Sequence, residues 1–175
     1  MEKDVRDPLV QQPRSSAARP PPRSQPLAVL YATREGQTRH IAEHVAARLR
    51  SRGLTVELEH VAHLPLGFSL SGHAGAILAA SIHMGEHERE MVKFVKRHRT
   101  ELESIPSTFL SVSLSEAGVE REATSPALRA RSESDVRAMI EAFIAETGWR
   151  PQVVRPVAGA LQFSRYGLVL SLIHI

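Results

Sequence analysis

The stretch YATREGQTRHIA, residues 31–42, holds the turn that decides the fold. It follows the short apolar run of residues 27–30 and precedes a segment in which Ile41, Val45 and Leu49 recur with helical spacing. A short apolar run suits a strand that is buried on both faces of a parallel sheet. A buried strand that turns directly into a helix begins a β-α-β unit, so this stretch predicts an α/β fold.

The turn itself, residues 33–38, has the composition of a small anion-binding loop. A helix N-terminus offers free N–H groups and the positive end of the helix dipole, which suits a phosphate. Thr33 and Thr38 add hydroxyl donors, and Gly36 permits a close approach or a positive φ. The turn lacks the Gly-Lys-Ser/Thr of triphosphate sites and the G-x-G-x-x-G of dinucleotide folds. It favours a small monophosphate held mainly by neutral donors, and the simpler alternative is that Thr38 only caps a helix.

The alternation of strands and helices continues along the chain. Periodicity and apolar runs predict strands over residues 27–32, 55–61, 75–81, 107–113 and 152–159, and helices over residues 38–52, 87–102 and 134–147. Residues 63–74 contain proline and two glycines, so no long helix is expected there, and residues 114–133 lack periodicity. The order predicts a doubly wound parallel sheet of about five strands, covered by helices on both faces in three layers.

Ligands of such sheets bind outside the carboxyl ends of the strands. The segments to inspect are therefore residues 32–38, 81–87, 113–120 and 159–166.

Composition narrows the classes of function. The 175 residues suffice for one domain with a core, and the absence of cysteine excludes disulfides, thiolate nucleophiles and zinc–thiolate or iron–sulfur sites. The formal net charge is +3, and most of that excess lies in residues 1–26. The remainder is nearly neutral and shows no basic stripe interleaved with aromatics, so we expect no nucleic-acid partner.

The two ends of the chain differ from the middle. Residues 1–26, rich in Pro, Ser and Arg, are expected to form a disordered arm, because they cannot bury enough apolar surface to offset the entropy of ordering. Residues 27–175 form the domain. Residues 167–175 start an apolar run that stops without a cap or a polar face, where a doubly wound domain needs a covering helix. We expect the C-terminal helix to be missing and the chain to be truncated there.

The segment VLYATREGQTRHIAEHV, residues 29–45, resembles the signature of the flavodoxin family. The matching positions are Val29, Leu30, Tyr31, Thr33, Gly36, Thr38, Ala42 and Val45. In that family this loop binds the phosphate of FMN. The resemblance implies FMN as the cofactor and, as phosphate contacts, Thr33, Arg34, Gly36, Gln37 and Thr38.

A closer resemblance covers residues 27 to about 166. The run GAILAASIHMGEHEREMVKFVKRHRTELESIPSTFLSVSL, residues 75–114, is similar to the menaquinone-dependent protoporphyrinogen oxidases, flavodoxin-like enzymes of haem synthesis. The segments 148–151 and 158–161 and an insert at residues 115–133 fit the same family. The resemblance implies FMN-dependent oxidation of protoporphyrinogen IX to protoporphyrin IX, with the electrons passed to a quinone.

The resemblance also implies where the ligands lie. Residues expected to flank the isoalloxazine ring are Ser81, Ile82, His83, Met84 and Gly85, and those expected at its edge are Ser113 and Leu114, which could equally be a plain strand–loop junction. Arg165 and Tyr166 are weaker candidates for docking an anionic substrate. No catalytic residue is nominated, because the cofactor carries out the electron transfer.

Several residues near these segments have simpler explanations. His83 and His87 have the spacing of metal ligands on a helix, but Gly85 interrupts it and no third ligand is evident, so no metal site is expected. The charged residues at positions 86 and 88–90 are predicted to be solvent-exposed side chains at the start of a helix. Met139 and Phe143 read as core residues.

Two other functions stay open at this point. An electron-transfer flavodoxin is typically strongly acidic, whereas this chain is neutral to basic and carries an insert, which favours the enzyme. A flavodoxin-domain protein without catalytic activity of its own is the second alternative. No secretory signal is visible, so we expect a cytoplasmic protein, with a peripheral contact on the inner face of the membrane through the basic arm or residues 163–175.

Overall fold

The computed structural model describes residues 25–113 and 125–158. The elements in these ranges are β1 (Leu27–Ala32), α1 (Gln37–Ser51), β2 (Val56–His60), η1 (Val61–His63), β3 (Gly75–His83), β4 (Glu86–His87), α2 (Arg89–Ser104), β5 (Ser107–Ser113), α4 (Pro126–Thr147) and β6 (Val153–Ala158). The expected alternation of strands and helices is confirmed, and the predicted bounds of β1 and β5 agree with the structure. The disordered arm, the C-terminal truncation and most of the insert concern residues outside the described ranges.

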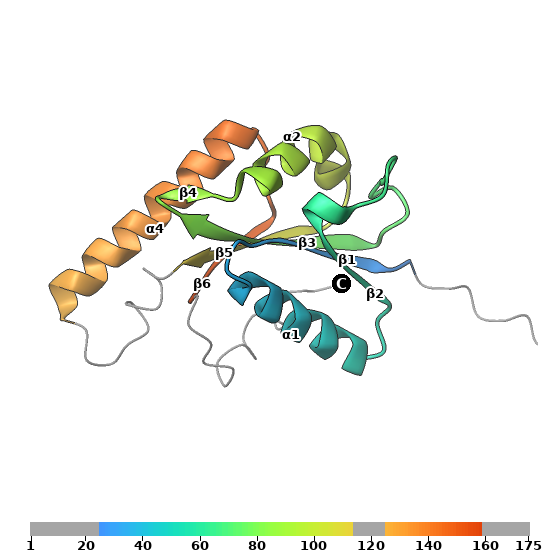
Figure 1. Ribbon diagram of the computed structural model, residues 1–175, viewed down its shortest axis with the longest axis horizontal. Coiled ribbons are helices and arrows are strands. Elements are labelled where there is room, and N and C mark those ends of the chain that lie inside the picture. Colours follow the sequence, from blue (N-terminus) through green and yellow to red (C-terminus); the bar gives the residue numbers. More distant parts are fainter. Residues whose placement is uncertain (1–24, 114–124, 159–175) are drawn as a thin grey trace, which may run out of the picture.

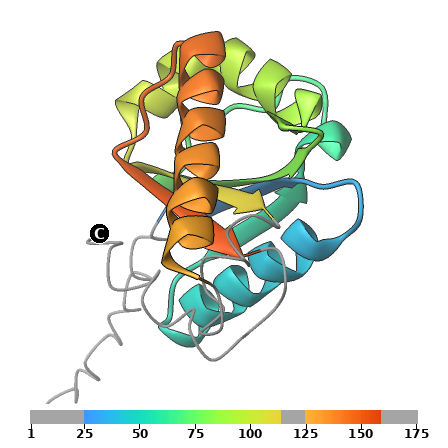
Figure 2. The ribbon, with the colours of Figure 1, turned by 90° about the vertical axis from the view of Figure 1, so that its left-hand side faces the viewer.

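The strands form one sheet in the order β2-β1-β3-β5-β6, and all four neighbouring pairs are parallel. Leu27 of β1 lies between Val56 of β2 and Gly75 of β3. Helix α1 covers one face of the sheet, and α2 and α4 cover the other (Figures 1 and 2). This is the predicted three-layer, doubly wound fold, whose strand order reverses direction beside β1 and β3.

Each face of the sheet has its own apolar core. Alternate residues of a strand point to opposite faces, so Val29 packs with Ile41 and Val45 of α1, whereas Leu30 packs with Met91 and other residues on the α2 and α4 side. Burial on both faces explains why β1 and β3 read as continuous apolar runs.

Two predicted boundaries were wrong. Strand β3 extends to His83 and pairs antiparallel with β4, so α2 begins at Arg89 and not at residue 87. Helix α4 begins at Pro126, so residues 126–133, predicted to lack regular structure, are helical. Proline fits the first turn of a helix because its missing N–H has no partner there anyway. The first turns of α4 are largely exposed, so they carry no apolar periodicity to detect.

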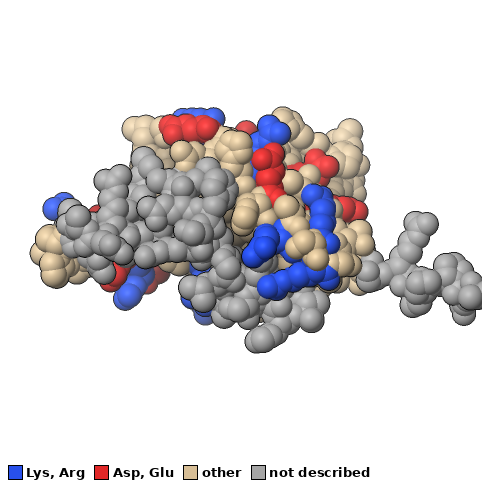
Figure 3. Space-filling view, turned by 90° about the horizontal axis from the view of Figure 1, so that it is seen from below, with Lys and Arg blue, Asp and Glu red and all other residues tan. Residues whose placement is uncertain are grey.

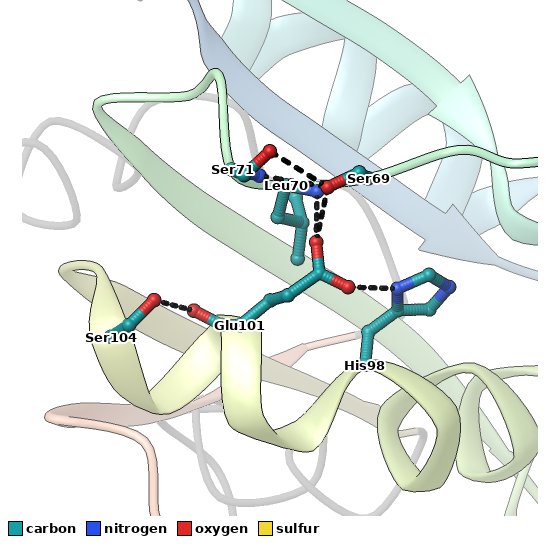
Figure 4. Close-up of polar contacts among 6 residues, drawn as sticks. All are labelled: Ser69, Leu70, Ser71, His98, Glu101 and Ser104. Atoms are coloured by element: carbon teal, nitrogen blue, oxygen red, sulfur yellow. Dashed lines mark hydrogen bonds and ion pairs between the residues drawn. The ribbon is translucent and has the colours of Figure 1, made fainter.

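The connection between β2 and β3 contains only the short η1, as expected, and polar contacts fasten it to α2. The Glu101 carboxylate accepts hydrogen bonds from Ser69 Oγ at 2.6 Å and from the Leu70 N–H at 2.5 Å, and its other oxygen lies 2.9 Å from His98 Nδ1 (Figure 4). Burial would raise the pKa of Glu101, but these hydrogen bonds outweigh it and hold the pKa below its usual value. We call these contacts of Glu101 with Ser69, Leu70 and His98 the Glu101 clamp. The side chain of Leu70, whose backbone N–H takes part in it, is fully buried.

The face that carries α1 shows Lys and Arg side chains beside Asp and Glu (Figure 3). The last turn of α1 contains Arg48 and Arg50. In the described ranges no helix is both long and apolar enough to cross a bilayer.

Candidate functional site

A cavity of about 200 Å³ opens at the carboxyl ends of β1, β3 and β5. Its walls come from the turn after β1, from the end of β3 with the following hairpin, and from the end of β5. The lining residues are Thr33, Arg34, Glu35, Gln37, Thr38, Ser81, Ile82, His83, Met84, Glu88, Val112 and Ser113. The cavity therefore lies where the strand order reverses, which is where doubly wound sheets bind ligands.

Most of the residues that the sequence singled out meet in this cavity. Gly36 and Gly85 do not line it: Gly36 begins α1, and Gly85 lines a neighbouring groove. Leu114, Arg165 and Tyr166 lie outside the described residues. That the residues in the cavity hold a cofactor stays a prediction.

Gly36 gives the turn its shape. It is the N-cap of α1 with φ 87°, a left-handed conformation that other residues rarely adopt. A Cβ at this position would meet no atom within 4 Å, so the requirement for glycine is conformational and not steric. The Gly36 N–H donates to Thr33 Oγ1 at 3.1 Å, which closes the turn.

Thr38 is fully buried, and its Oγ1 has no hydrogen-bond partner among the described residues. The simpler alternative, that Thr38 only caps the helix, is ruled out, because Gly36 is the N-cap of α1 and makes no side-chain capping hydrogen bond. A buried hydroxyl without a partner costs about 1–3 kcal/mol. Its position in the first turn of α1, beside helix N–H groups and in the wall of the cavity, fits a bound phosphate.

Glu88 was missed by the sequence analysis, which placed it on a solvated helix start. Its side chain is only 9% exposed and lines the cavity. It accepts a hydrogen bond from Ser81 Oγ at 3.4 Å and lies 3.7 Å from Arg34 Nη2. The Arg34–Glu88 ion pair thus connects the turn after β1 to the start of α2 across the cavity.

A tight hairpin between β3 and β4 brings Glu88 back to the site. Ile82 pairs with His87 and His83 with Glu86, which leaves Met84 and Gly85 as a two-residue turn with φ 51° and 85°. Positive φ at both central residues defines a type I′ turn. Met84 is 91% exposed and lies at the rim of the cavity.

His87 points away from the cavity. It is buried against Phe109 and Phe143, with ring centroids 5.2 and 4.8 Å apart, and its Nε2 lies 2.9 Å from Ser111 Oγ. Burial lowers the pKa of His87 to about 4. It lies on β4 and not on a helix with His83, and no potential metal-binding cluster occurs in the described ranges.

A second hollow, which we call the hairpin groove, joins the cavity. It has a volume of about 510 Å³ and is lined by Ile82, Met84, Gly85, Ser113, Asp135, Ala138 and Met139. Three of these, Ile82, Met84 and Ser113, also line the cavity. Met139 is half-buried and lines this groove, so its prediction as a core residue was wrong, whereas Phe143 is in the core as predicted.

The strand order, and a cavity at the carboxyl ends of the strands, are those of a flavodoxin-like fold. The family model of the flavodoxin domain matches residues 28–172, and the chain belongs to that family. This membership supports a flavin as the cofactor.

The chain is similar to the protoporphyrinogen IX dehydrogenase (quinone) of Escherichia coli strain K12, with 32% identity over 138 residues, or 79% of this chain and 70% of that protein. It is also 29% identical over 140 residues to the protein of the same name from Leishmania major, or 79% of this chain and 55% of that protein. The expected resemblance is thereby confirmed.

Solved structures of similar fold include oxidised Flavodoxin 1 from Bacillus cereus, with a TM-score of 0.49, 16% identity and coverage of 83% of this chain and 92% of that chain. Another is a flavodoxin from the domain Archaea, with a TM-score of 0.46, 16% identity and coverage of 75% and 83%.

Proposed function

We propose that this protein is an FMN-dependent enzyme that oxidises protoporphyrinogen IX to protoporphyrin IX and passes the electrons to a quinone. The names of the two curated relatives support the substrate and the acceptor. The structural observation that carries the cofactor assignment is the buried Thr38 hydroxyl, which has no hydrogen-bond partner within residues 25–113 and 125–158 and lies in the cavity at the start of α1.

The turn after β1 would hold the phosphate of FMN. Thr38 Oγ1 and the free N–H groups of the first turn of α1 are the donors, and Arg34 supplies a positive charge at the cavity. The turn contains no lysine, so the grip rests mainly on neutral donors. Such a set suits a single phosphate better than a triphosphate with its metal ion.

The rest of the cavity would hold the flavin ring. Ile82, His83 and Met84 from the hairpin and Ser113 from β5 line that part of the wall. Bound FMN supplies the two-electron chemistry, and the chain binds it, orients it and limits its contact with water. No nucleophile or general base is therefore needed among the chain's own residues.

The test starts with the full chain. It is purified, incubated with FMN and freed of excess cofactor, and the bound flavin is identified by its visible spectrum and by chromatography. Protoporphyrinogen IX and a quinone are then added without oxygen, and porphyrin fluorescence is followed.

We expect a yellow protein that produces fluorescence in the presence of the quinone. A yellow protein without fluorescence supports the electron-transfer alternative, and a colourless protein that ignores added FMN overturns the proposal.

We also propose a cytoplasmic protein that touches the membrane peripherally, because a lipid-soluble quinone is reached there. Fractionation at low salt tests this. The full-length protein should sediment in part with membranes, and its complete recovery in the soluble fraction would contradict the contact.

A further inference from the structure

We propose that the hairpin groove is the docking site of the quinone acceptor, which it receives as an uncharged ring. This inference rests on the proposed function, because that function supplies the quinone. It adds the place where the acceptor binds and the residues that select it.

The hairpin groove is continuous with the cavity. The hairpin groove and the cavity share Ile82, Met84 and Ser113 in their walls, so a ligand in one lies next to a ligand in the other. A molecule that exchanges electrons with a flavin in the cavity must reach it, and this groove opens directly onto the cavity wall.

The wall of the hairpin groove carries little charge, and that charge is negative. Among the described residues that line the hairpin groove, Asp135 is the only one with an ionisable side chain. A carboxylate without a neighbouring cation in the wall disfavours anionic ligands. Protoporphyrinogen IX carries two carboxylates, whereas a quinone is neutral. Of the two reaction partners, the groove therefore suits the quinone.

The side chains that line the hairpin groove suit a flat apolar ring. The walls are mainly apolar, and Met84 and Met139 come from two different elements. Thioether side chains are flexible and polarizable, so they adapt to flat apolar rings. Ala138 of α4 also lines the groove, and its small side chain leaves space there for a ligand.

The backbone of Met84 adopts a left-handed conformation with φ 51°. A non-glycine residue with positive φ costs about 1 kcal/mol or more, and such strain persists mainly at functional sites. Here it holds a 91% exposed apolar side chain at the wall between the cavity and the groove. An apolar ligand in the groove would cover that side chain.

The reaction balances without further reagents. The quinone takes up two electrons and two protons and becomes a quinol, and each oxidation step of the porphyrinogen releases two electrons and two protons. The hairpin groove therefore needs only to bind the neutral quinone ring next to the flavin in the cavity.

The closing experiment uses the FMN-loaded full chain without porphyrinogen. The flavin is reduced with dithionite in the absence of oxygen, a neutral naphthoquinone is added at increasing concentration, and reoxidation is followed by flavin absorbance. Ala138→Trp fills the groove, and because Ala138 is exposed the larger side chain need not disturb the core. Ala145→Trp is the matched control, an exposed alanine two turns further along α4.

We expect Ala138→Trp to raise the quinone concentration for half-maximal reoxidation at least about 10-fold, a change of about 1.4 kcal/mol. Its FMN affinity should stay that of wild type, and Ala145→Trp should resemble wild type in both measurements. Unchanged reoxidation in Ala138→Trp, or a wild-type protein that no neutral quinone reoxidises, overturns the inference.

A second arm tests the charge. Wild type should need a lower concentration of the neutral naphthoquinone than of its sulfonated form for half-maximal reoxidation of the flavin. Asp135→Asn should reduce the ratio of these two concentrations several-fold at low salt. An unchanged preference contradicts the role of Asp135. Because porphyrinogen is absent from both arms, the groove can be supported even if the protein fails to oxidise porphyrinogen.

Discussion

Thr38 combines two properties that a stable core rarely combines: full burial, and a hydroxyl without a hydrogen-bond partner in the part of the chain that the structure describes. Such a group lowers stability in the free protein and becomes useful once a ligand bonds to it. The sequence indicated a threonine at a helix start but could not reveal its missing partner, because burial at this position depends on strands that lie far apart in the chain.

Thr38→Val should therefore separate stability from binding. Valine has nearly the same shape, so we expect the unliganded protein to gain about 1 kcal/mol in the free energy of unfolding, while FMN binding weakens about 10-fold or more. Urea unfolding of the unliganded protein and flavin fluorescence titration measure the two effects. Thr38→Ser should keep the affinity, and a loss of stability in Thr38→Val without any loss of affinity would contradict this role.

Met84, on the surface, is also a residue that we expect to lower stability and to contribute to ligand binding. Its turn has the type I′ geometry that Asn-Gly favours, and methionine stands at the first central position. We expect Met84→Asn to raise the unfolding free energy by about 0.5–1 kcal/mol while slowing reoxidation of the flavin by the quinone. Met84→Ala, which lacks the preference for positive φ, should slow the reaction without the gain in stability. Equal stability changes in both variants would remove the argument from backbone strain.

At the scale of elements, the connection between β2 and β3 contains no long helix, and the hydrogen bonds of Glu101 fasten it to α2 instead. One carboxylate fastens Ser69 and Leu70 to α2 and also bonds to His98. The sequence indicated the missing helix from its proline and glycines, but the contact joins residues about 30 positions apart and leaves no local pattern.

Glu101→Gln should destabilise the protein by about 1 kcal/mol at neutral pH. The pKa of Glu101 is lowered in the folded state, so its contribution is complete above the unfolded pKa and is lost as the pH falls through the folded value. Urea midpoints of the variant and wild type should therefore converge in acid. Glu103→Gln, an exposed position on the same helix, should change little, and a gap for Glu101→Gln that persists at low pH would speak against the clamp.

His87 anchors the short strand β4 in the core beside Ser111. Its pKa is lowered from 6.5 to about 4, so between these values the unfolded chain binds a proton that the folded protein does not. Stability should fall as the pH drops through this window, by up to about 1.4 kcal/mol per pH unit. The slope of unfolding free energy against pH should be smaller in His87→Gln, and an equal slope would mean that another group titrates.

The elements that the sequence predicted best are those with long buried stretches. β1 and β5 are largely buried, and their predicted bounds agreed with the structure. β4 has two residues, too few for any periodicity, so the hairpin and the inward position of Glu88 were missed with it. The start of α4 was missed because most residues of its first turns whose burial is described are exposed, so no apolar pattern marks them.

At the scale of the whole molecule, the strand order brings two loops and the end of β5 to one edge of the sheet. The turn after β1 offers the phosphate donors, the hairpin after β3 forms the wall, and β5 closes the far side. The position of the cavity followed from the predicted topology alone, since ligands of doubly wound sheets bind where the strand order reverses. The hairpin groove could not be predicted, because it needs the hairpin and the early start of α4.

The central claim is that a single phosphate is gripped at the start of α1, and comparison of FMN with riboflavin tests it most directly. The two flavins differ only in that phosphate, and the full chain can be titrated with each under the same conditions. We predict that FMN binds at least about 100-fold more tightly, as several hydrogen bonds to a charged group require. Equal affinities for the two flavins would contradict the account.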